Sequence, residues 1–434
     1  MGTWTDGDIV IPEKIDGYTV TKIGNGAFEN GRNIYSVVMP NTVVTIGDNA
    51  FQWCDSLQSI TLSSRLTSIG AAAFKRCHAL TSIAMPDTLA SIGAEAFYEC
   101  LSLEDVTLSK NLVCIENAVF KICSSLKHIT IPDSVESIGE YAFDYCEALE
   151  EITIPRRTVV IDNGAFEHCV SLKTVTILSA SGIIDSFAFN HCESLEKVSL
   201  SNGIESIGFY AFRECTNLKS ITIPSSVKVI YEYAFEYCGA LETVTLNEGL
   251  KTIGNAAFAS CKALKAIVIP ESVTELGTGV FSGCSSLKSA KLPSKIMVIN
   301  HSMFSGCTSL EAITIPASVT EIGSQAFKYC SSLTTIVIPD GVTTINDETF
   351  ANCSNLKDVT LPKNLTSIGN RSFIHCKSLT RIMLPEKIMS VGSEAFYYCD
   401  NLKTVLVPEG KLLFVKSSFK ANEPIDFIEY KDYL

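Results

Sequence analysis

Hydrophobic and polar positions follow one another along this chain in a pattern that repeats every 23 residues. Phe stands at eighteen positions of this register, from Phe28 to Phe419, with no insertion or deletion in the series. Cys follows three residues after the Phe in sixteen consecutive repeats, Cys54 to Cys399, and Leu follows three residues after the Cys. The repeating unit reads LxxIxIPxxVxxIGxxAFxxCxx. A fixed period of this length predicts a solenoid, in which each repeat is one supersecondary unit stacked on the next.

The columns of the repeat predict local structure. The LxxIxI segment predicts a strand with one buried face, and strands that recur in one direction pair in parallel. The following Pro cannot donate to a ladder and ends the strand. We expect the Gly of the Ile-Gly pair to form a backbone corner at positive φ, because four of its replacements are the Asp and Asn residues that best tolerate this conformation. Those four are Asp162, Asp185, Asn300 and Asn346. The xxAFxxC segment predicts one or two turns of helix with Phe, Cys and Leu in the core.

Charged residues give a separate test of the stacking register. The residue after the repeat Leu alternates in sign over eight repeats: Glu104, Lys127, Glu150, Lys173, Glu196, Lys219, Glu242 and Lys265. Parallel neighbours lie about 4.8 Å apart, so like charges in this column would face each other on every rung. The alternation therefore predicts a ladder of opposite charges on stacked rungs.

The unbroken register predicts one elongated domain over residues 1–434, with about eighteen rungs. We expect residues 1–34 to form an atypical N-terminal capping repeat, 35–408 the regular repeats and 409–434 a C-terminal cap. In the cap, Asn422 stands where the Cys column continues. The repeat at 178–184 departs from the pattern, with Leu178 at the Pro position, which predicts a locally irregular rung.

Composition and charge exclude several functions. The net charge is −13 and Lys and Arg do not cluster, which argues against nucleic acid and anionic membranes as partners. No stretch approaches the ~18 apolar residues of a membrane span. No nucleophile motif, phosphate-binding Gly loop or carboxylate pair stands outside the repeat, so we expect neither catalysis nor a cofactor. The sequence contains no signal peptide or anchor, and we expect these targeting segments to lie outside it.

The Cys and His columns each allow more than one interpretation. The favoured interpretation of the Cys column is a row of buried thiols acting as small hydrophobic side chains. Disulfides between neighbouring rungs and metal binding are the alternatives. His168, His191 and His375 share the column before Cys with several Tyr residues, and His168 and His191 lie on adjacent rungs. Because a third ligand at fixed spacing is missing, an aromatic surface is favoured there over a metal site.

The repeat LxxIxIPxxVxxIGxxAFxxC, together with the opening IPEKIDGYTVTKIGNGAF, resembles the BspA-like subfamily of bacterial leucine-rich repeats over almost the whole chain. The resemblance implies an α/β fold: a right-handed, curved solenoid with a parallel sheet on one face and short helices or turns on the other. It also implies a secreted or cell-surface bacterial protein. Some members of the family bind host matrix proteins and some act in adhesion. The family has no catalytic residues to carry over.

Candidate binding residues lie between the two buried aliphatic positions of each strand, where a side chain must point out of the sheet. This column is mostly Thr, which is the simplest composition for an exposed strand face. Toward the C-terminus it becomes apolar, and exposed apolar residues there predict a partner site. The candidates are Thr314, Val337, Thr360, Met383 and Leu406.

The leading hypothesis is therefore a cell-surface or secreted adhesion module that recognises a host or bacterial protein, for example a matrix protein, or a glycan through the sheet face. A structural spacer that presents another domain is the second hypothesis. A third, an intracellular protein-interaction scaffold, agrees with the row of unpaired Cys. The expected presence or absence of export and anchoring signals in the full-length gene distinguishes the three.

Overall fold

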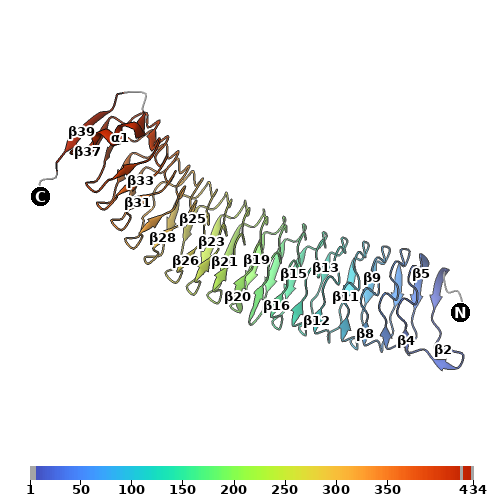
Figure 1. Ribbon diagram of the computed structural model, residues 1–434. Coiled ribbons are helices and arrows are strands. Elements are labelled where there is room, and N and C mark those ends of the chain that lie inside the picture. The colour runs from blue at the N-terminus through green and yellow to red at the C-terminus, as the bar shows by residue number, and fades with distance from the viewer. Residues whose placement is uncertain (1–5, 421–423, 432–434) are drawn as a thin grey trace. The chain divides into compact units, whose positions relative to one another are not determined.

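The computed structural model describes residues 6–420 and 424–431, in two compact units, Met1–Leu218 and Lys219–Leu434. Each unit is a parallel β-solenoid in which every regular rung adds one turn of 23 residues. The LxxIxI segment supplies one strand of the rung, here named the front strand, and the VxxIG segment supplies a shorter one, the side strand. Figure 1 shows both rows in the first unit, with side strands β4, β8, β12 and β16 in one row and front strands β5, β9 and β15 in the other.

The front strands pair in parallel with a register shift of one repeat, as the sequence predicts. Ile152 thus lies opposite Val175, and Ile221 opposite Val244. In the first unit they are β1 (Asp6–Val10), β5 (Asn33–Val38), β7 (Ser59–Thr61), β9 (Ser82–Ala84), β11 (Asp105–Thr107), β13 (His128–Ile129), β15 (Glu151–Ile154), β17 (Thr174–Ile177) and β19 (Lys197–Leu200). In the second they are β21 (Ser220–Ile223), β23 (Thr243–Leu246), β25 (Ala266–Val268), β27 (Ser289–Lys291), β30 (Thr335–Val337), β32 (Asp358–Thr360), β34 (Arg381–Met383), β37 (Thr404–Pro408) and β39 (Asp426–Tyr430).

The side strands form a second row of parallel pairs, which the sequence analysis did not predict. Their buried Ile lies opposite the Ile of the next rung, as in the pair Ile46 and Ile69. In the first unit they are β4 (Lys22–Ile23), β6 (Thr45–Ile46), β8 (Ser68–Ile69), β10 (Ser91–Ile92), β12 (Cys114–Ile115), β14 (Ser137–Ile138), β16 (Val160–Ile161), β18 (Gly182–Ile184) and β20 (Ile204–Ile207). In the second they are β22 (Val229–Ile230), β24 (Thr252–Ile253), β26 (Glu275–Leu276), β28 (Val298–Ile299), β29 (Glu321–Ile322), β31 (Thr344–Ile345), β33 (Ser367–Ile368) and β35 (Ser390–Val391).

The xxAFxxC segments are turns, and the prediction of helix there is wrong. Two residues per regular rung have positive φ, most of them not Gly, for example Ala72 at 52° and Arg76 at 63°, and this breaks a helix. The backbone N–H groups reach the next rung instead, as Phe51 N does to Ala73 O at 2.7 Å. In the described residues one short α-helix, α1 (Leu412–Val415), and one 3₁₀ turn, η1 (Lys416–Ser418), remain. The expected α/β class is therefore not confirmed, and right-handedness and curvature stay predictions.

The Gly column is explained by close packing, so the predicted positive-φ corner is wrong. Gly70 and Gly93 do not have positive φ. A Cβ atom on Gly70 would lie 2.5 Å from the backbone N of Asp48 in the preceding rung, and one on Gly93 would lie 2.4 Å from that of Ala71. Where Asn346 replaces the Gly, its amide donates to the carbonyl of Ile322 at 2.7 Å.

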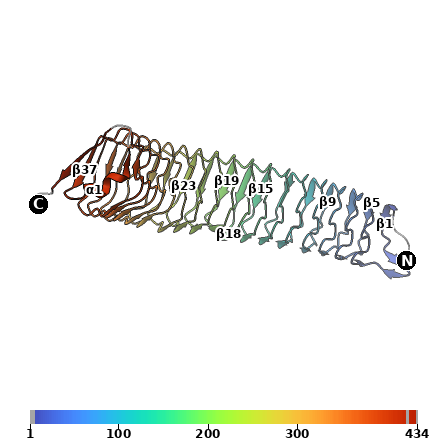
Figure 2. The same ribbon diagram turned by 45° about the horizontal axis from the view of Figure 1, so that its top comes forward.

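The core of each unit is built from the repeat columns. Neighbouring Phe rings stack almost parallel, with centroids 5.2 Å apart for Phe51 and Phe74. The Cys and Leu columns are buried beside them. The two strand rows enclose this core, and Figure 2 shows β9, β15 and β19 of the first unit from a second direction.

Both ends differ from the regular rungs. Residues Lys14–Ile15 (β2) and Tyr18–Thr19 (β3) form an antiparallel hairpin, and Asp16 and Gly17 between them have positive φ, as a two-residue hairpin turn requires. At the other end β39 pairs with β37, and Phe396–Tyr397 (β36) pairs with Phe419–Lys420 (β38). Asn422 lies outside the described residues.

Two further predictions of register are confirmed. The pairing of β18 with β20 shifts between Gly182 and Ile183, so the rung after residue 178 is irregular. The charge ladder forms ion pairs over part of its length, with Lys173 Nζ 2.9 Å from Glu150 and Lys265 Nζ 2.5 Å from Glu242, whereas Glu104 and Lys127 make none in the described residues. None of the helices in residues 6–420 and 424–431 has the length and hydrophobicity needed to span a lipid bilayer.

Candidate functional site

The five candidate residues all lie on the front strands of the second unit or between them. Val337 and Met383 are exposed on β30 and β34, at 64% and 47% of their surface. Thr360 is exposed on β32, and Leu406 is half-buried on β37. Thr314 is exposed in a segment that forms no strand. The alternation of the strand therefore predicted the outward direction of four candidates well and overestimated the exposure of Leu406.

The structure places these residues in neighbouring pairs. Val337 lies opposite Thr360 in the ladder of β30 and β32, and Met383 lies opposite Leu406 in that of β34 and β37. Thr314 and Val337 line one groove, described below. The candidates therefore form a strip over five consecutive rungs, although strand pairing is missing between β32 and β34.

The row of front strands in the second unit is interrupted at residues 311–316. The ladder ends at β27, the next segment has no strand, and pairing resumes between β30 and β32. An apolar groove of about 430 Å³ opens at this interruption. It is lined by Ala312, Ile313, Thr314, Ile315, Ala317, Thr335, Val337 and Pro339. The sequence analysis did not predict this groove.

Two features of the sequence mark the interruption. Ala290 stands at the inward position of β27, where the other regular rungs carry Ile or Val. In the turns, Val280 and Met303 replace the small Ala before Phe, and the rungs spread there. Ring centroids of Phe281 and Phe304 are 5.7 Å apart and those of Phe258 and Phe281 are 6.0 Å apart, against 5.2 Å for the pair before. A smaller inward side chain and wider spacing both weaken the contact between neighbouring rungs.

In the first unit the same outward column begins with Val10 and Val38, contains Ala84, and is a row of hydroxyls from Thr107 to Ser199. Thr153 lies opposite Thr176, and Thr176 opposite Ser199. The inward neighbours Ile152 and Val175 are buried, as an alternating strand requires. From Thr107 to Ser199 this surface is a regular polar sheet face, and the large exposed apolar side chains of this column in the first unit lie at its N-terminal end, at Val10 and Val38.

The sixteen Cys of the repeat column are free thiols, and the interpretation as small buried side chains is the one that the geometry favours. Each thiol faces the preceding rung. Cys100 Sγ, for example, donates a hydrogen bond to the carbonyl oxygen of Phe74 at 3.2 Å. Burial raises the pKa of Cys100 and Cys284 to about 12. A protonated, buried thiol is neither a nucleophile nor a metal ligand at neutral pH.

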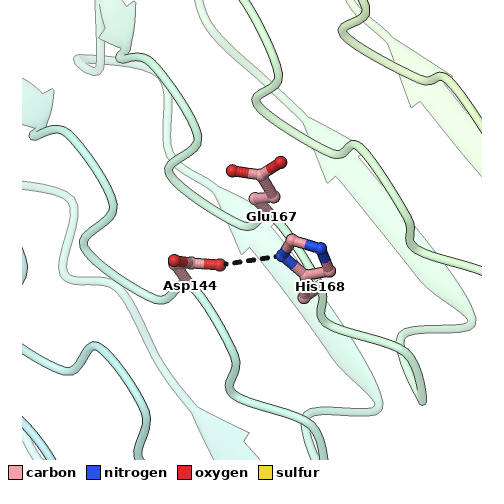
Figure 3. Close-up of side chains that lie close together, drawn as sticks. All are labelled: Asp144, Glu167 and His168. Carbon is pink, nitrogen blue, oxygen red and sulfur yellow. Dashed lines mark hydrogen bonds and ion pairs between the residues drawn. The ribbon is translucent and has the colours of Figure 1, made fainter.

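The column before Cys carries a polar cluster in the first unit. Asp144, Glu167 and His168 come within 4.8 Å of one another (Figure 3). Asp144 is buried, and its carboxylate lies 3.3 Å from His168 Nδ1 and 2.9 Å from Lys121 Nζ. The Lys121 ammonium thus already neutralises Asp144, and Asn190 donates to Glu167 at 2.8 Å. Asp144 and Glu167, the two members of the cluster that the sequence did not single out, both come from the column directly after Phe.

The predicted aromatic surface beside this cluster is confirmed. His168 stacks on Tyr145, with centroids 4.1 Å apart, and on His191, 5.0 Å away. His191 in turn lies 3.0 Å from the carboxylate of Glu214. In the second unit His375 stacks on Tyr398 at 4.7 Å. These rings cover one another, so the column presents ring edges to solvent.

Known proteins share this repeat and this fold. A leucine-rich repeat protein from Bacteroides ovatus has 32% identity to this chain, covering 84% of it and 88% of that protein, with a TM-score of 0.64. A leucine-rich cell surface protein from Faecalibacterium prausnitzii has 31% identity over 81% of this chain and 87% of that protein, with a TM-score of 0.44. None of the curated proteins compared with this chain matches it.

The family model of the BspA-type leucine-rich repeat region matches most of the sequence. The matched segments are residues 21–146, 113–241, 182–311 and 320–432. Together with the repeat columns and the stacked rungs, this match identifies the family. The chain belongs to the BspA-type leucine-rich repeat proteins.

Proposed function

We propose that this chain is a binding module that holds a protein partner on the front strands of its second unit. Leucine-rich repeat solenoids are protein-interaction scaffolds, which use their long regular faces for binding. The observation that carries the proposal is the apolar groove between Ala312 and Pro339, beside the exposed side chain of Val337.

The groove and the strip of candidates belong to one contact area, because Thr314 and Val337 are part of both. A volume of about 430 Å³ is within the range of about 300–1,000 Å³ that small-molecule and side-chain binding pockets occupy. Met383 extends the apolar surface two rungs beyond Val337. Apolar side chains exposed together on a folded surface are a mark of partner binding, because burying them removes apolar area from water.

A secreted or cell-surface location and a role in adhesion are the finer parts of the proposal. They are supported by the family resemblance of the repeat. A protein of the host or of another bacterium is the favoured partner, and matrix proteins and glycans are the classes to test first. Fractionation of the native cells tests the location: recovery of the protein at the cell surface or in the medium would support it, and recovery inside the cell would contradict it.

The binding experiment uses the full chain on a sensor surface, exposed to matrix proteins, mucin and a glycan array. For any ligand that binds, the double variant V337D/M383D is compared with the unsubstituted chain. The matched control is T107D/T153D, which places the same charges on the front strands of the first unit. Thermal unfolding of each variant checks that the fold is kept.

We expect V337D/M383D to lower affinity at least about tenfold, because a partner must then bury a carboxylate against apolar surface. The control is expected to change affinity less than about twofold. Equal effects of both double variants, or none from either, would show that the ligand binds elsewhere. A chain that binds no ligand and is followed in its gene by a further domain would favour the spacer instead.

A further inference from the structure

The two units differ in charge, although the sequence repeat is the same. Residues 1–218 contain 14 Lys and Arg against 27 Asp and Glu, whereas residues 219–434 contain 20 of each. The first unit therefore carries the whole net charge of −13, and the second is neutral. The positions of the cations in the second unit therefore bear on the charge of its partner.

The front strands of the second unit carry an excess of these cations. Exposed cations at the start of these strands or pointing out from them are Lys219, Lys265, Lys288, Lys291, Lys357, Arg381 and Lys403. The corresponding carboxylates are Glu242, Glu311, Asp358 and Asp426. In the first unit the same positions carry Lys127, Lys173 and Lys197 against Asp8, Glu104, Asp105, Glu150, Glu151 and Glu196. The sign of the front face thus reverses between the units.

Four of the cations make no ion pair within the described part of the chain: Lys291, Lys357, Arg381 and Lys403. By contrast, Lys265 pairs with Glu242 at 2.5 Å and Lys288 approaches Glu311 at 3.9 Å. The unpaired cations lie on both sides of the groove. Lys357 directly precedes β32, and Arg381 lies on β34 in the same strand as Met383.

We propose that the partner held by this face is an acidic, extended polypeptide segment that carries apolar side chains among its carboxylates. The inference rests on the proposed function and names the chemistry of its ligand. Cationic side chains flank the apolar groove and share rungs with Met383 and Leu406, and rungs about 4.8 Å apart are a spacing that side chains on one face of an extended peptide can follow. A polyanion without apolar groups would leave Val337, Met383 and the groove uncovered.

The test is an array of twelve-residue peptides of random sequence, varied in net charge and hydropathy, probed with the full chain in 50 mM and 300 mM NaCl. The best binders are then labelled with fluorescein and titrated by anisotropy. One variant reverses the four cations (K291E/K357E/R381E/K403E). Its matched control reverses four exposed lysines away from the front strands (K251E/K262E/K363E/K377E). Both variants are checked for cooperative thermal unfolding.

We expect the bound peptides to be enriched in Asp and Glu with at least one aliphatic or aromatic residue. Affinity should fall at least about tenfold in the front-strand variant, less than about threefold in the control, and severalfold between the two salt concentrations. Three other outcomes would overturn the inference.

If neutral apolar peptides bind equally well, and only V337D/M383D abolishes their binding, the ligand is not acidic. The proposed function would then still stand. If neither V337D/M383D nor the reversal of the four cations reduces binding, both the inference and the proposed function are contradicted. Concentration-dependent self-association that disappears in the charge reversal, without peptide binding, would identify a second copy of this chain, through its acidic first unit, as the occupant.

Discussion

At Gly70 of the Ile-Gly pair, two rungs approach so closely that a side chain on the same backbone would clash with the preceding rung. We predict that Gly70→Ala destabilises the fold by about 1–3 kcal/mol, since the new Cβ would lie 2.5 Å from the backbone of Asp48. Gly239→Ala is the matched control, because a Cβ there meets nothing within 4 Å. Chemical denaturation measures both variants. A Gly70→Ala protein as stable as the control would show that close approach does not explain this column.

The Phe column is the largest buried residue type of every regular rung. We predict that Phe166→Ala, between the stacked rings of Phe143 and Phe189, costs about 3–5 kcal/mol. Val159→Ala, at an exposed position, should change stability by less than about 0.5 kcal/mol.

In a stack of repeats each rung contacts its neighbours, so the damage from Phe166→Ala should be local. Hydrogen exchange should speed up in the rungs next to residue 166 and not at rungs far from it in the first unit. Uniform loosening of that unit would contradict the nearest-neighbour account.

At the scale of the element, the sequence predicted the front strands and mispredicted the turns. The alternation of buried Ile152 and exposed Thr153 is a local signal that any half-buried strand shows. The turns have no such signal, because their geometry depends on bonds to the next rung, such as Phe51 N to Ala73 O. The two-residue side strands were missed for the same reason: they exist only as pairs between rungs.

The spread between rungs is an element-scale feature, and Met303 is the bulkiest residue that directly precedes a Phe of the column. We predict that Met303→Ala brings the ring centroids of Phe281 and Phe304 from 5.7 Å toward the 5.2 Å of the pair Phe235 and Phe258. A crystal structure of the variant measures this distance and shows whether residues 311–316 then pair as a strand. An unchanged spacing would assign the spread to another residue.

For the whole molecule, the row of buried thiols predicts a strong response to alkaline pH. The pKa of Cys100 is raised by burial from 9.0 to about 12, and Cys284 and Cys353 behave alike. Between pH 9 and 12 the unfolded chain therefore loses thiol protons that the folded chain keeps, and stability falls as pH rises. Each such thiol contributes a slope of about 1.4 kcal/mol per pH unit.

Denaturation midpoints between pH 7 and 10.5 check this slope, with oxidants excluded. A Cys100→Ala variant should show a shallower pH dependence than the unsubstituted chain. Stability that stays constant through this range would mean that the thiols ionise in the folded state, contrary to their burial.

The candidate binding strip could be predicted only in part. Exposure of Val337 and Met383 followed from strand alternation. The groove lies where residues 311–316 form no strand, and the unusual Ala290 and Met303 in the neighbouring rungs mark this place in the sequence without predicting a groove. The reversal in front-strand charge between the units was present in the sequence, but only the register of rungs shows which charges share a face.

Hydrogen–deuterium exchange of the full chain, free and saturated with a ligand obtained from the binding experiments, tests the central claim most directly. The account predicts slower exchange in residues 311–317, 335–339 and 381–383, with little change in the turns of the same rungs. Protection confined to those turns, or to the front strands of residues 1–218, would contradict it.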